Sequence, residues 1–232
     1  MKTIGLIGGM SWESSLEYYR LINEGVKARL GGLHSAKSVM ASVDFAEIEL
    51  LQHENRWRES AEILIDAARG VEAAGAACVV ICTNTMHKVA DDIQAVVKIP
   101  LLHIADATAE RVKASGLQRI GLLGTHFTME EDFYVGRLIR QHGLDVIVPD
   151  PIERADVHRV IYDELCLGIT QAESKARYVQ IMEQLIARGA QGIILGCTEI
   201  GLLVQQADSR VPLFDTTLIH AEAAVDYALR ND

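Results

Sequence analysis

The chain repeats itself, and this repeat constrains the fold more than any other feature of the sequence. The segment Ile4–Gly8 (IGLIG) returns almost unchanged as Ile120–Gly124 (IGLLG). Two further pairs recur in the same order, Gly-Ala at 75–76 and 189–190, and Ile/Val-Pro-Leu at 99–101 and 211–213. Landmarks at nearly constant spacing predict that the two halves of the chain fold alike.

Each half alternates short apolar runs with longer amphipathic stretches. The run Cys78–Ile81 is typical of a buried strand, whereas Glu13–Leu30 places Leu16, Tyr19 and Ile22 at helical spacing. Such alternation favours a parallel sheet covered on both faces. We therefore predict an α/β fold of two similar domains, each a mostly parallel sheet flanked by helices, related by a pseudo-two-fold axis. The carboxyl ends of their strands would face one interdomain cleft, because open α/β sheets bind ligands there.

The predicted elements follow the same pattern in both halves. The strands are Ile4–Ile7, Ser38–Val43, Cys78–Ile81 and Pro100–Ile104, then Arg119–Leu123, Leu144–Val148, Gly192–Leu195 and Pro212–Phe214. The helices are Glu13–Leu30, Asn55–Ala74 and Thr85–Val96, then Thr128–His142, Thr170–Arg188 and Thr217–Arg230. Thr128 and Thr170 each begin a Thr-x-x-Glu pattern, which is typical of a capping box. The closing helix has no partner strand of its own in the second half, so the predicted domains are 1–102 plus 211–232 and 103–210.

Charge and cysteine content exclude several classes of protein. Asp and Glu number 32 against 22 Lys and Arg, a net charge of −10 with no basic stretch, so nucleic acid and anionic membranes are poor partners. No apolar run approaches the ~20 residues of a membrane span. The four cysteines are too few and too unevenly spaced for a disulfide scaffold, and none forms a C-x2-C zinc pattern. The N-terminus reads as a strand rather than a signal peptide. We expect a cytoplasmic protein without a metal site.

Two strand ends carry the residues best suited to chemistry. The repeat pairs residues 80–85 (VICTNT) with 194–199 (ILGCTE), which sets Thr83 opposite Cys197 and Cys82 opposite Gly196. Each segment runs from a strand into a helix start, whose N–H groups can hold a carboxylate and lower the pKa of a thiol. A thiolate on one wall and a hydroxyl on the other indicate proton transfer across a bound substrate. The alternative is that Cys197 is a small core residue at a strand end.

These segments resemble a known family. Residues 79–87 (VVICTNTMH) and 193–200 (IILGCTEI) resemble the two signatures of the aspartate/glutamate racemase superfamily, and 5–12 (GLIGGMSW) resembles the opening of its aspartate-racemase branch. The resemblance implies two α/β domains, a homodimer and inversion of an amino-acid α-carbon without pyridoxal phosphate or another cofactor. In that family two opposed cysteines remove and return the α-proton.

The chain departs from the family pattern at the first cysteine. The position directly before Asn-Thr is Thr83 here, and Cys82 lies one residue earlier. Adjacent residues of a strand point in opposite directions, so pleat and repeat favour Thr83, while a local shift that lets Cys82 serve stays open. The hypothesis is that the Cys197 thiolate removes the α-proton and Thr83 donates one on the opposite face. A hydroxyl is a poor base, so one enantiomer would be the preferred substrate.

Other polar residues near these strand ends are candidates for binding the substrate amino acid. Five of them are expected to hold the α-carboxylate and α-ammonium: Asn84, Thr85, Thr125, Thr198 and Glu199. Glu199 is the natural ammonium partner or proton relay; alternatively it is an exposed carboxylate favoured by a helix start. Met10 either lines the pocket or packs in the core, and His87 either supports the carbanion or is a buried helix residue.

Gln52 bears on which side chain the substrate carries. The resemblance implies that aspartate-specific members hold the distal carboxylate with cations, whereas this loop offers an amide and residues 161–168 contain no Lys or Arg. Acidic substrates and a broader set therefore both stay open. Two further alternatives are a related cofactor-free decarboxylase or isomerase, and a non-catalytic amino-acid-binding protein.

Overall fold

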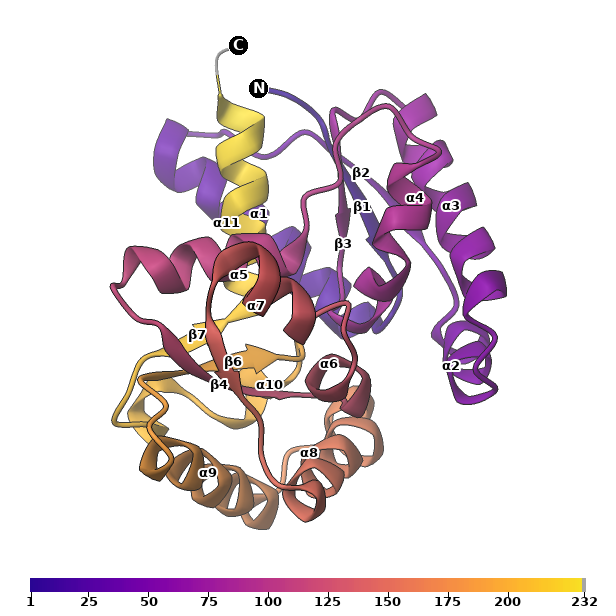
Figure 1. Ribbon diagram of the computed structural model, residues 1–232. Helices are drawn as coiled ribbons and strands as arrows, with labels where there is room; N and C mark the ends of the chain where they lie inside the picture. Colours follow the sequence, from indigo (N-terminus) through magenta and orange to yellow (C-terminus); the bar gives the residue numbers. More distant parts are fainter. Residues whose placement is uncertain (231–232) are drawn as a thin grey trace. The chain divides into compact units, whose positions relative to one another are not determined.

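The computed structural model describes residues 1–230 and divides into two compact α/β units (Figure 1). Unit 1 comprises Met1–His103 and the chain from His220 on, and unit 2 comprises Ile104–Ile219. Each unit contains one parallel sheet with helices against it, which confirms the predicted fold class. Among the described residues no helix combines the length and the apolar character that a membrane crossing requires.

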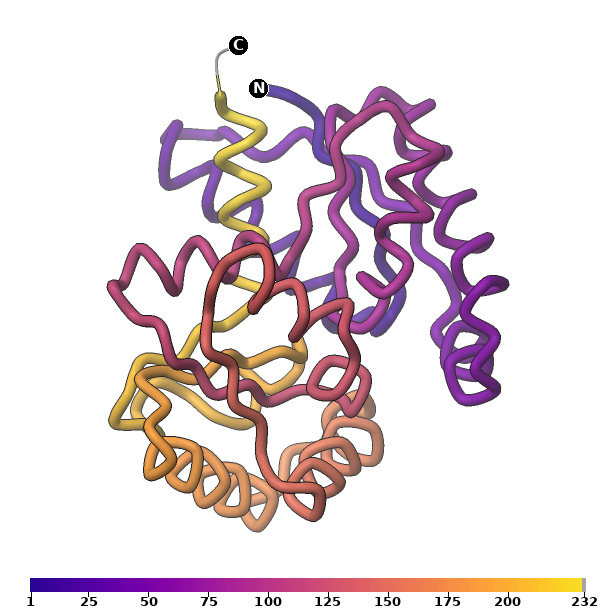
Figure 2. Tube along the Cα trace, in the orientation of Figure 1, coloured from indigo at the N-terminus to yellow at the C-terminus, as the bar shows by residue number. Residues whose placement is uncertain are grey.

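Unit 1 is built on a three-stranded parallel sheet in the order β2-β1-β3. Its strands are β1 (Ile4–Gly8), β2 (Ser38–Ser42) and β3 (Cys78–Ile81). Its helices are α1 (Trp12–Leu30), α2 (Phe45–His53), α3 (Trp57–Ala73), η1 (Thr85–Val89), α4 (Ala90–Gln94) and α11 (Thr216–Leu229), which enters from unit 2. The start of the chain lies beside α11, where the Lys2 N–H donates to the Ala228 carbonyl at 2.8 Å (Figure 2).

The side chains of β3 alternate between two cores, as the pleat requires. Cys78 and Val80 pack with α1 and α11, in a cluster that contains Tyr18. Val79 and Ile81 pack on the opposite face with side chains of α3 and α4. This alternation decides which way the residues after β3 point, and therefore bears on the candidate site.

Unit 2 is built on a four-stranded parallel sheet in the order β5-β4-β6-β7. Its strands are β4 (Arg119–Gly124), β5 (Asp145–Ile147), β6 (Gly192–Gly196) and β7 (Leu213–Asp215). Its helices are α5 (Ile104–Ala114), α6 (His126–Glu130), α7 (Val135–His142), α8 (Pro151–Asp163), η2 (Leu165–Leu167), α9 (Ala172–Ala187), α10 (Ile200–Leu203) and η3 (Gln206–Asp208). The order β5-β4-β6 matches β2-β1-β3, so the repeat seen in the sequence corresponds to equivalent strands.

Some predicted elements differ from the structure. The expected strand Pro100–Ile104 is reduced to one bridge between Val79 and Leu101, because the chain turns into α5 at Ile104. β7 pairs with β6, so the chain stays in unit 2 beyond the expected return at residue 211 and reaches unit 1 only within α11. The prediction that the chain re-enters unit 1 at residue 211 is wrong because a strand as short as β7 carries no local signal that shows which strand it pairs with.

Both predicted capping boxes are wrong. The first cap is Thr125, whose hydroxyl accepts from the Thr128 N–H, and the helix that it begins breaks after Glu130 before α7. The helix predicted at Thr170 starts at Ala172 without a side-chain cap. A capping box does form at α8, between Asp150 and Glu153, which the sequence analysis did not identify.

Candidate active site

Cys82 and Thr83, which follow the carboxyl end of β3, lie in different surroundings. Cys82 continues the alternation of Cys78 and Val80, is fully buried, and belongs to the core cluster of α1 and α11. This burial raises the pKa of the Cys82 thiol far above its usual range. Its carbonyl accepts from the Ser14 hydroxyl at 2.8 Å, which ties the strand end to the first turn of α1. Thr83, the next residue, is half-buried.

A group of buried histidines holds the backbone of Thr83. The His87 Nδ1 lies 2.8 Å from the Thr83 carbonyl oxygen, and because a carbonyl can only accept, the proton of His87 is on Nδ1. The His87 ring packs against His103, with ring centroids 4.6 Å apart, and against His220, 5.6 Å away. The sequence analysis left His87 as a carbanion support or a buried residue; the structure shows a buried side chain that fixes the position of Thr83.

His220 anchors α11 to the rest of unit 1. Its Nε2 donates to the Leu102 carbonyl at 2.7 Å, so its Nδ1 carries the lone pair and accepts from the Tyr18 hydroxyl at 2.8 Å. Full burial lowers the pKa of His220 to about 4, although the hydrogen bond to Leu102 acts in the opposite direction. The imidazole is therefore neutral at pH 7.

At the carboxyl end of β6, a thiol is hydrogen-bonded to a carboxylate. The Cys197 thiol donates to Glu199 Oε2 at 3.0 Å, and the Thr198 hydroxyl donates to the same oxygen at 2.7 Å. Both Cys197 and Glu199 are buried, Glu199 with 3% of its surface exposed. A carboxyl group with so little exposed surface is not the exposed helix-start residue that was the alternative.

The pKa of Cys197 moves in the direction opposite to the one expected from a helix start. Burial raises it well above its usual range, and the negative charge of Glu199 raises it further. The helix that follows, α10, has only four residues, so its end offers little to oppose these effects. At neutral pH the side chain is a thiol whose proton is directed at Glu199.

Thr125 lies at the same sheet edge as Cys197. Gly124 and Gly196 are register partners in β4 and β6, and Thr125 and Cys197 directly follow them. A Cβ at Gly124 would lie 2.9 Å from the Gly196 carbonyl oxygen, so glycine is required for this close approach. Thr125, Cys197, Thr198 and Glu199 are therefore brought together within unit 2.

The remaining candidates lie in unit 1, and most are buried. Asn84 and Thr85 follow Thr83 into η1 and have 2% and 6% of their surfaces exposed. Met10, with 4% exposed, belongs to the core cluster on the α3 face. The Gln52 amide donates to the Met86 sulfur at 3.0 Å, which brings α2 against η1.

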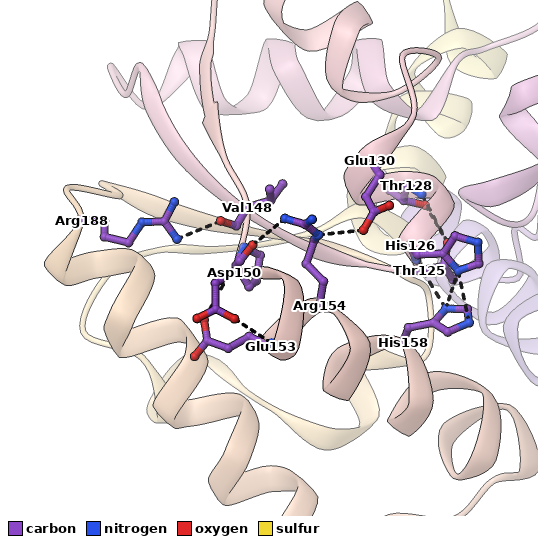
Figure 3. Close-up of polar contacts among 11 residues, drawn as sticks. Thr125, His126, Thr128, Glu130, Val148, Asp150, Glu153, Arg154, His158 and Arg188 are labelled. Atoms are coloured by element: carbon purple, nitrogen blue, oxygen red, sulfur yellow. Dashed lines mark hydrogen bonds and ion pairs between the residues drawn. The ribbon is translucent and has the colours of Figure 1, made fainter.

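The sequence analysis did not identify a pair of histidines beside Thr125. His126, the first residue of α6, contacts His158 of α8, with the ring centroids 4.3 Å apart (Figure 3). No local signal connects two residues that are 32 positions apart. Within residues 1–230 no group of three or more His, Cys, Asp or Glu side chains is arranged to hold a metal ion.

Comparisons with known proteins agree with this arrangement. A model of the family described as Asp/Glu/Hydantoin racemase matches residues 7–224. A crystal structure from Yersinia pestis, provisionally described as an Asp/Glu racemase, is 59% identical, with a TM-score of 0.93 over 99% of this chain and 100% of that one. An aspartate racemase homologue from Pyrococcus horikoshii is 36% identical, with a TM-score of 0.86 over 99% and 100%. The broad specificity amino-acid racemase RacX of Bacillus subtilis is 25% identical over 171 residues, 72% of this chain and 71% of that protein.

Proposed function

Because the chain belongs to the Asp/Glu/Hydantoin racemase family, we propose that it is an amino-acid racemase that inverts the α-carbon without pyridoxal phosphate. The observation that carries the proposal is the hydrogen bond of 3.0 Å from the Cys197 thiol to the buried Glu199 carboxylate at the end of β6. An acid and its acceptor, buried together at a strand end, are the components that proton transfer from carbon requires.

Cys197 and Glu199 act together as the base. Glu199 takes the Sγ proton, and the thiolate so formed removes the α-hydrogen of the substrate as a proton. The electron pair of the broken C–H bond stays on the α-carbon and is delocalised into the α-carboxylate. The Glu199 carboxylate thus stores the thiol proton while Cys197 holds the substrate proton, and Glu199 then releases its proton to solvent, which restores the starting state.

Thr83 returns a proton on the opposite face of the substrate. Its hydroxyl donates to the carbanion, which is a much stronger base than an alkoxide, and the alkoxide is then neutralised by a proton from solvent. Cys82 does not fit this role well, because it is fully buried on the other side of the strand. A threonine is a poor base, so the proposed reaction runs much faster from one enantiomer than from the other.

The α-carboxylate and α-ammonium bind to polar groups at the same strand ends. We assign this to Asn84 and Thr85 in unit 1 and to Thr125 and Thr198 in unit 2. Preorganised donors of this kind stabilise the charge that develops on the carboxylate as the proton leaves. The substrate class includes acidic amino acids, because the P. horikoshii relative is described as an aspartate racemase homologue and the Y. pestis relative provisionally as an Asp/Glu racemase. It extends to other amino acids, because RacX is described as a racemase of broad specificity.

The test is incubation of single L- and D-amino acids in deuterated water. We expect inversion accompanied by α-deuterium uptake. Cys197→Ala should abolish it, Thr83→Ala should strongly reduce it, and Thr83→Ser should restore part of it. Cys82→Ala is the matched control, since it changes the adjacent thiol and should retain inversion.

Other outcomes identify the rival functions. Product without inversion would indicate a related decarboxylase or isomerase, and binding without exchange a non-catalytic amino-acid-binding protein. Full racemisation by Thr83→Ala together with an inactive Cys82→Ala would reverse the assignment of the acid.

A further inference from the structure

A cavity of about 420 Å³ lies in unit 1, between α3 and the short helices η1 and α4. Its volume falls within the range of small-molecule sites, ~300–1,000 Å³. One wall is a face of α3, on which Trp57, Ala61 and Ile65 follow one another at intervals of one helical turn. Val89 of η1 lies on the opposite wall. These four side chains form the apolar floor of the cavity.

Two pairs of opposite charges line the rim of the cavity. On α3 the Arg58 Nε lies 3.5 Å from Glu62 Oε1, and both side chains are largely exposed to solvent. Lys88 of η1 and Asp92 of α4 belong to the opposite wall. The four groups together carry no net charge at neutral pH. Such a rim favours a ligand that is neutral overall, because an anion or a cation would meet as much repulsion as attraction.

Two contacts define the direction in which the walls of the cavity run. The Lys88 Nζ lies 3.9 Å from the centroid of the Trp57 ring, at the start of α3. Further along the chain, the Lys98 N–H donates to Glu72 Oε1 at 2.7 Å, near the end of α3. The segment that contains η1 and α4 therefore runs beside α3 in the same direction (Figure 1). Lys88 lies at the Trp57 end of the cavity, and Asp92 lies one helical turn further along.

The positive charge at this end is held in position by an aromatic ring. The Trp57 Nε1–H donates to Asn55 Oδ1 at 2.7 Å, which fixes the orientation of the indole. The Lys88 ammonium lies over that indole, where the negative face of the ring attracts the cation. Both side chains are half-buried. A cation that is already positioned beside an apolar floor is suited to bind a carboxylate, because little side-chain freedom is lost on binding.

We propose that this cavity binds a free α-amino acid that has an apolar side chain. The Lys88 ammonium pairs with the α-carboxylate, Asp92 pairs with the α-ammonium, and the side chain of the ligand packs on the apolar floor. Lys88 and Asp92 are about 6 Å apart along the helix axis, so both charged groups of one α-carbon fit between them. The inference goes beyond the proposed function, since the ligand binds here without being turned over.

The cavity shares one helix with the candidate active site. η1 contributes Lys88 and Val89 to the cavity wall, and it also carries His87, whose Nδ1 lies 2.8 Å from the Thr83 carbonyl oxygen. A ligand in the cavity therefore contacts the helix that holds the backbone of the proposed acid. This position is suited to regulation of the reaction by an amino acid other than the substrate.

The chain contains its own probe for this site, because Trp57 lines the cavity and is one of only two tryptophans. In the parent variant Trp12→Phe, tryptophan fluorescence reports on Trp57 alone. Titration with L-leucine should change this fluorescence and yield a dissociation constant. Isoamylamine is leucine without its carboxylate, and isocaproate is leucine without its ammonium. Each should bind about fivefold more weakly than leucine, the effect of losing one exposed ion pair.

Two variants in the same background assign each charge of the ligand to its partner. In Lys88→Gln, leucine and isoamylamine should bind alike, because the partner of the carboxylate is gone. In Asp92→Asn, leucine and isocaproate should bind alike, because the partner of the ammonium is gone. Comparing each variant with each analogue separates a lost pair from general damage to the cavity. Asp91→Asn is the matched control, since Asp91 is an exposed neighbour on α4 outside this lining, and it should bind leucine as the parent does.

Three results would overturn the site. The first is equal binding of leucine, isoamylamine and isocaproate by the parent variant. The second is a response that Cys197→Ala removes and Asp92→Asn does not, which would place the ligand in the active site. The third is a Trp57 signal that depends on protein concentration alone, which would indicate that a second copy of the chain covers the cavity. Because binding is measured without turnover, intact leucine binding in a protein without racemase activity would reject the proposed function and leave the cavity site standing.

Discussion

Acid should destabilise unit 1 through one buried histidine, His220. Its ring is neutral in the folded protein, where burial lowers its pKa from 6.5 to about 4. In the unfolded chain the same ring takes up a proton near pH 6.5. As the pH falls from about 6.5 to 4, the unfolded state therefore binds protons that the folded state rejects, and the free energy of unfolding decreases.

The size of this effect follows from the two pKa values. A pKa that falls from 6.5 to about 4 corresponds to about 3 kcal/mol of stability, lost in full once the pH reaches about 4. Below that value both states are protonated and this residue causes no further loss. A change of this size is a large part of the stability of an ordinary domain, about 5–15 kcal/mol.

The variant His220→Gln removes the titrating group. Its amide can still donate to the Leu102 carbonyl, but the acceptor of the Tyr18 hydroxyl is lost, at a cost of about 1–3 kcal/mol at pH 7. The wild type should therefore be the more stable protein at pH 7, and the difference should shrink or reverse towards pH 4.

Urea unfolding followed by tryptophan fluorescence measures this difference. The two tryptophans, Trp12 and Trp57, both belong to unit 1, so the signal reports the unit that contains His220. His158→Gln removes a histidine whose pKa is also lowered to about 4 but which lies in unit 2, and serves as the matched control. Equal pH dependence in wild type and His220→Gln would refute the reasoning.

Three further predictions concern Glu199, a pair of glycines and Asp106. Glu199→Gln should reduce kcat by about 10²–10⁴-fold in the deuterium exchange assay, because an amide cannot take the Cys197 proton. Gly5→Ala should destabilise by about 1–3 kcal/mol in urea unfolding, since its Cβ would lie 2.8 Å from the Cβ of Ala76, whereas Gly70→Ala, with open space and a helical position, should stabilise by about 0.5–1 kcal/mol. Burial alone would raise the pKa of Asp106, but hydrogen bonds, those of Arg137 above all, lower it, so Asp106→Asn should reduce the melting temperature at pH 7 and change it least in acid.

The sequence predicted the parts of the fold that depend on local pattern. The matching segments Ile4–Gly8 and Ile120–Gly124 are the central strands of the two sheets, and the apolar runs beside them pair as equivalent neighbours. The place of β7 was not predicted, because pairing with β6 is a long-range choice.

The candidate site divides in the same way between local and long-range features. The contact from His87 to the Thr83 carbonyl spans four residues, and so lies within reach of sequence reasoning. The contact of His126 with His158 depends on how α6 packs against α8, and no pattern within either helix predicts it. The direction in which a strand residue points is, by contrast, a local feature. Cys82 lies on the same buried side as Cys78 and Val80, as the alternation of side chains along a strand predicts.

For the pKa of Cys197, reasoning from the local sequence predicts the wrong direction. A thiol at a helix start is expected to have a lowered pKa, but that expectation requires a helix long enough and a thiol exposed enough for the helix end to matter. α10 has four residues, Cys197 is buried, and the adjacent carboxylate is negative, so all three circumstances favour the thiol. The proton therefore stays on the Cys197 sulfur, which donates to Glu199 Oε2, and the same oxygen accepts from the Thr198 hydroxyl. In the proposed mechanism, removing the α-proton therefore requires the proton of Cys197 to move first, which makes Glu199 part of the proposed base.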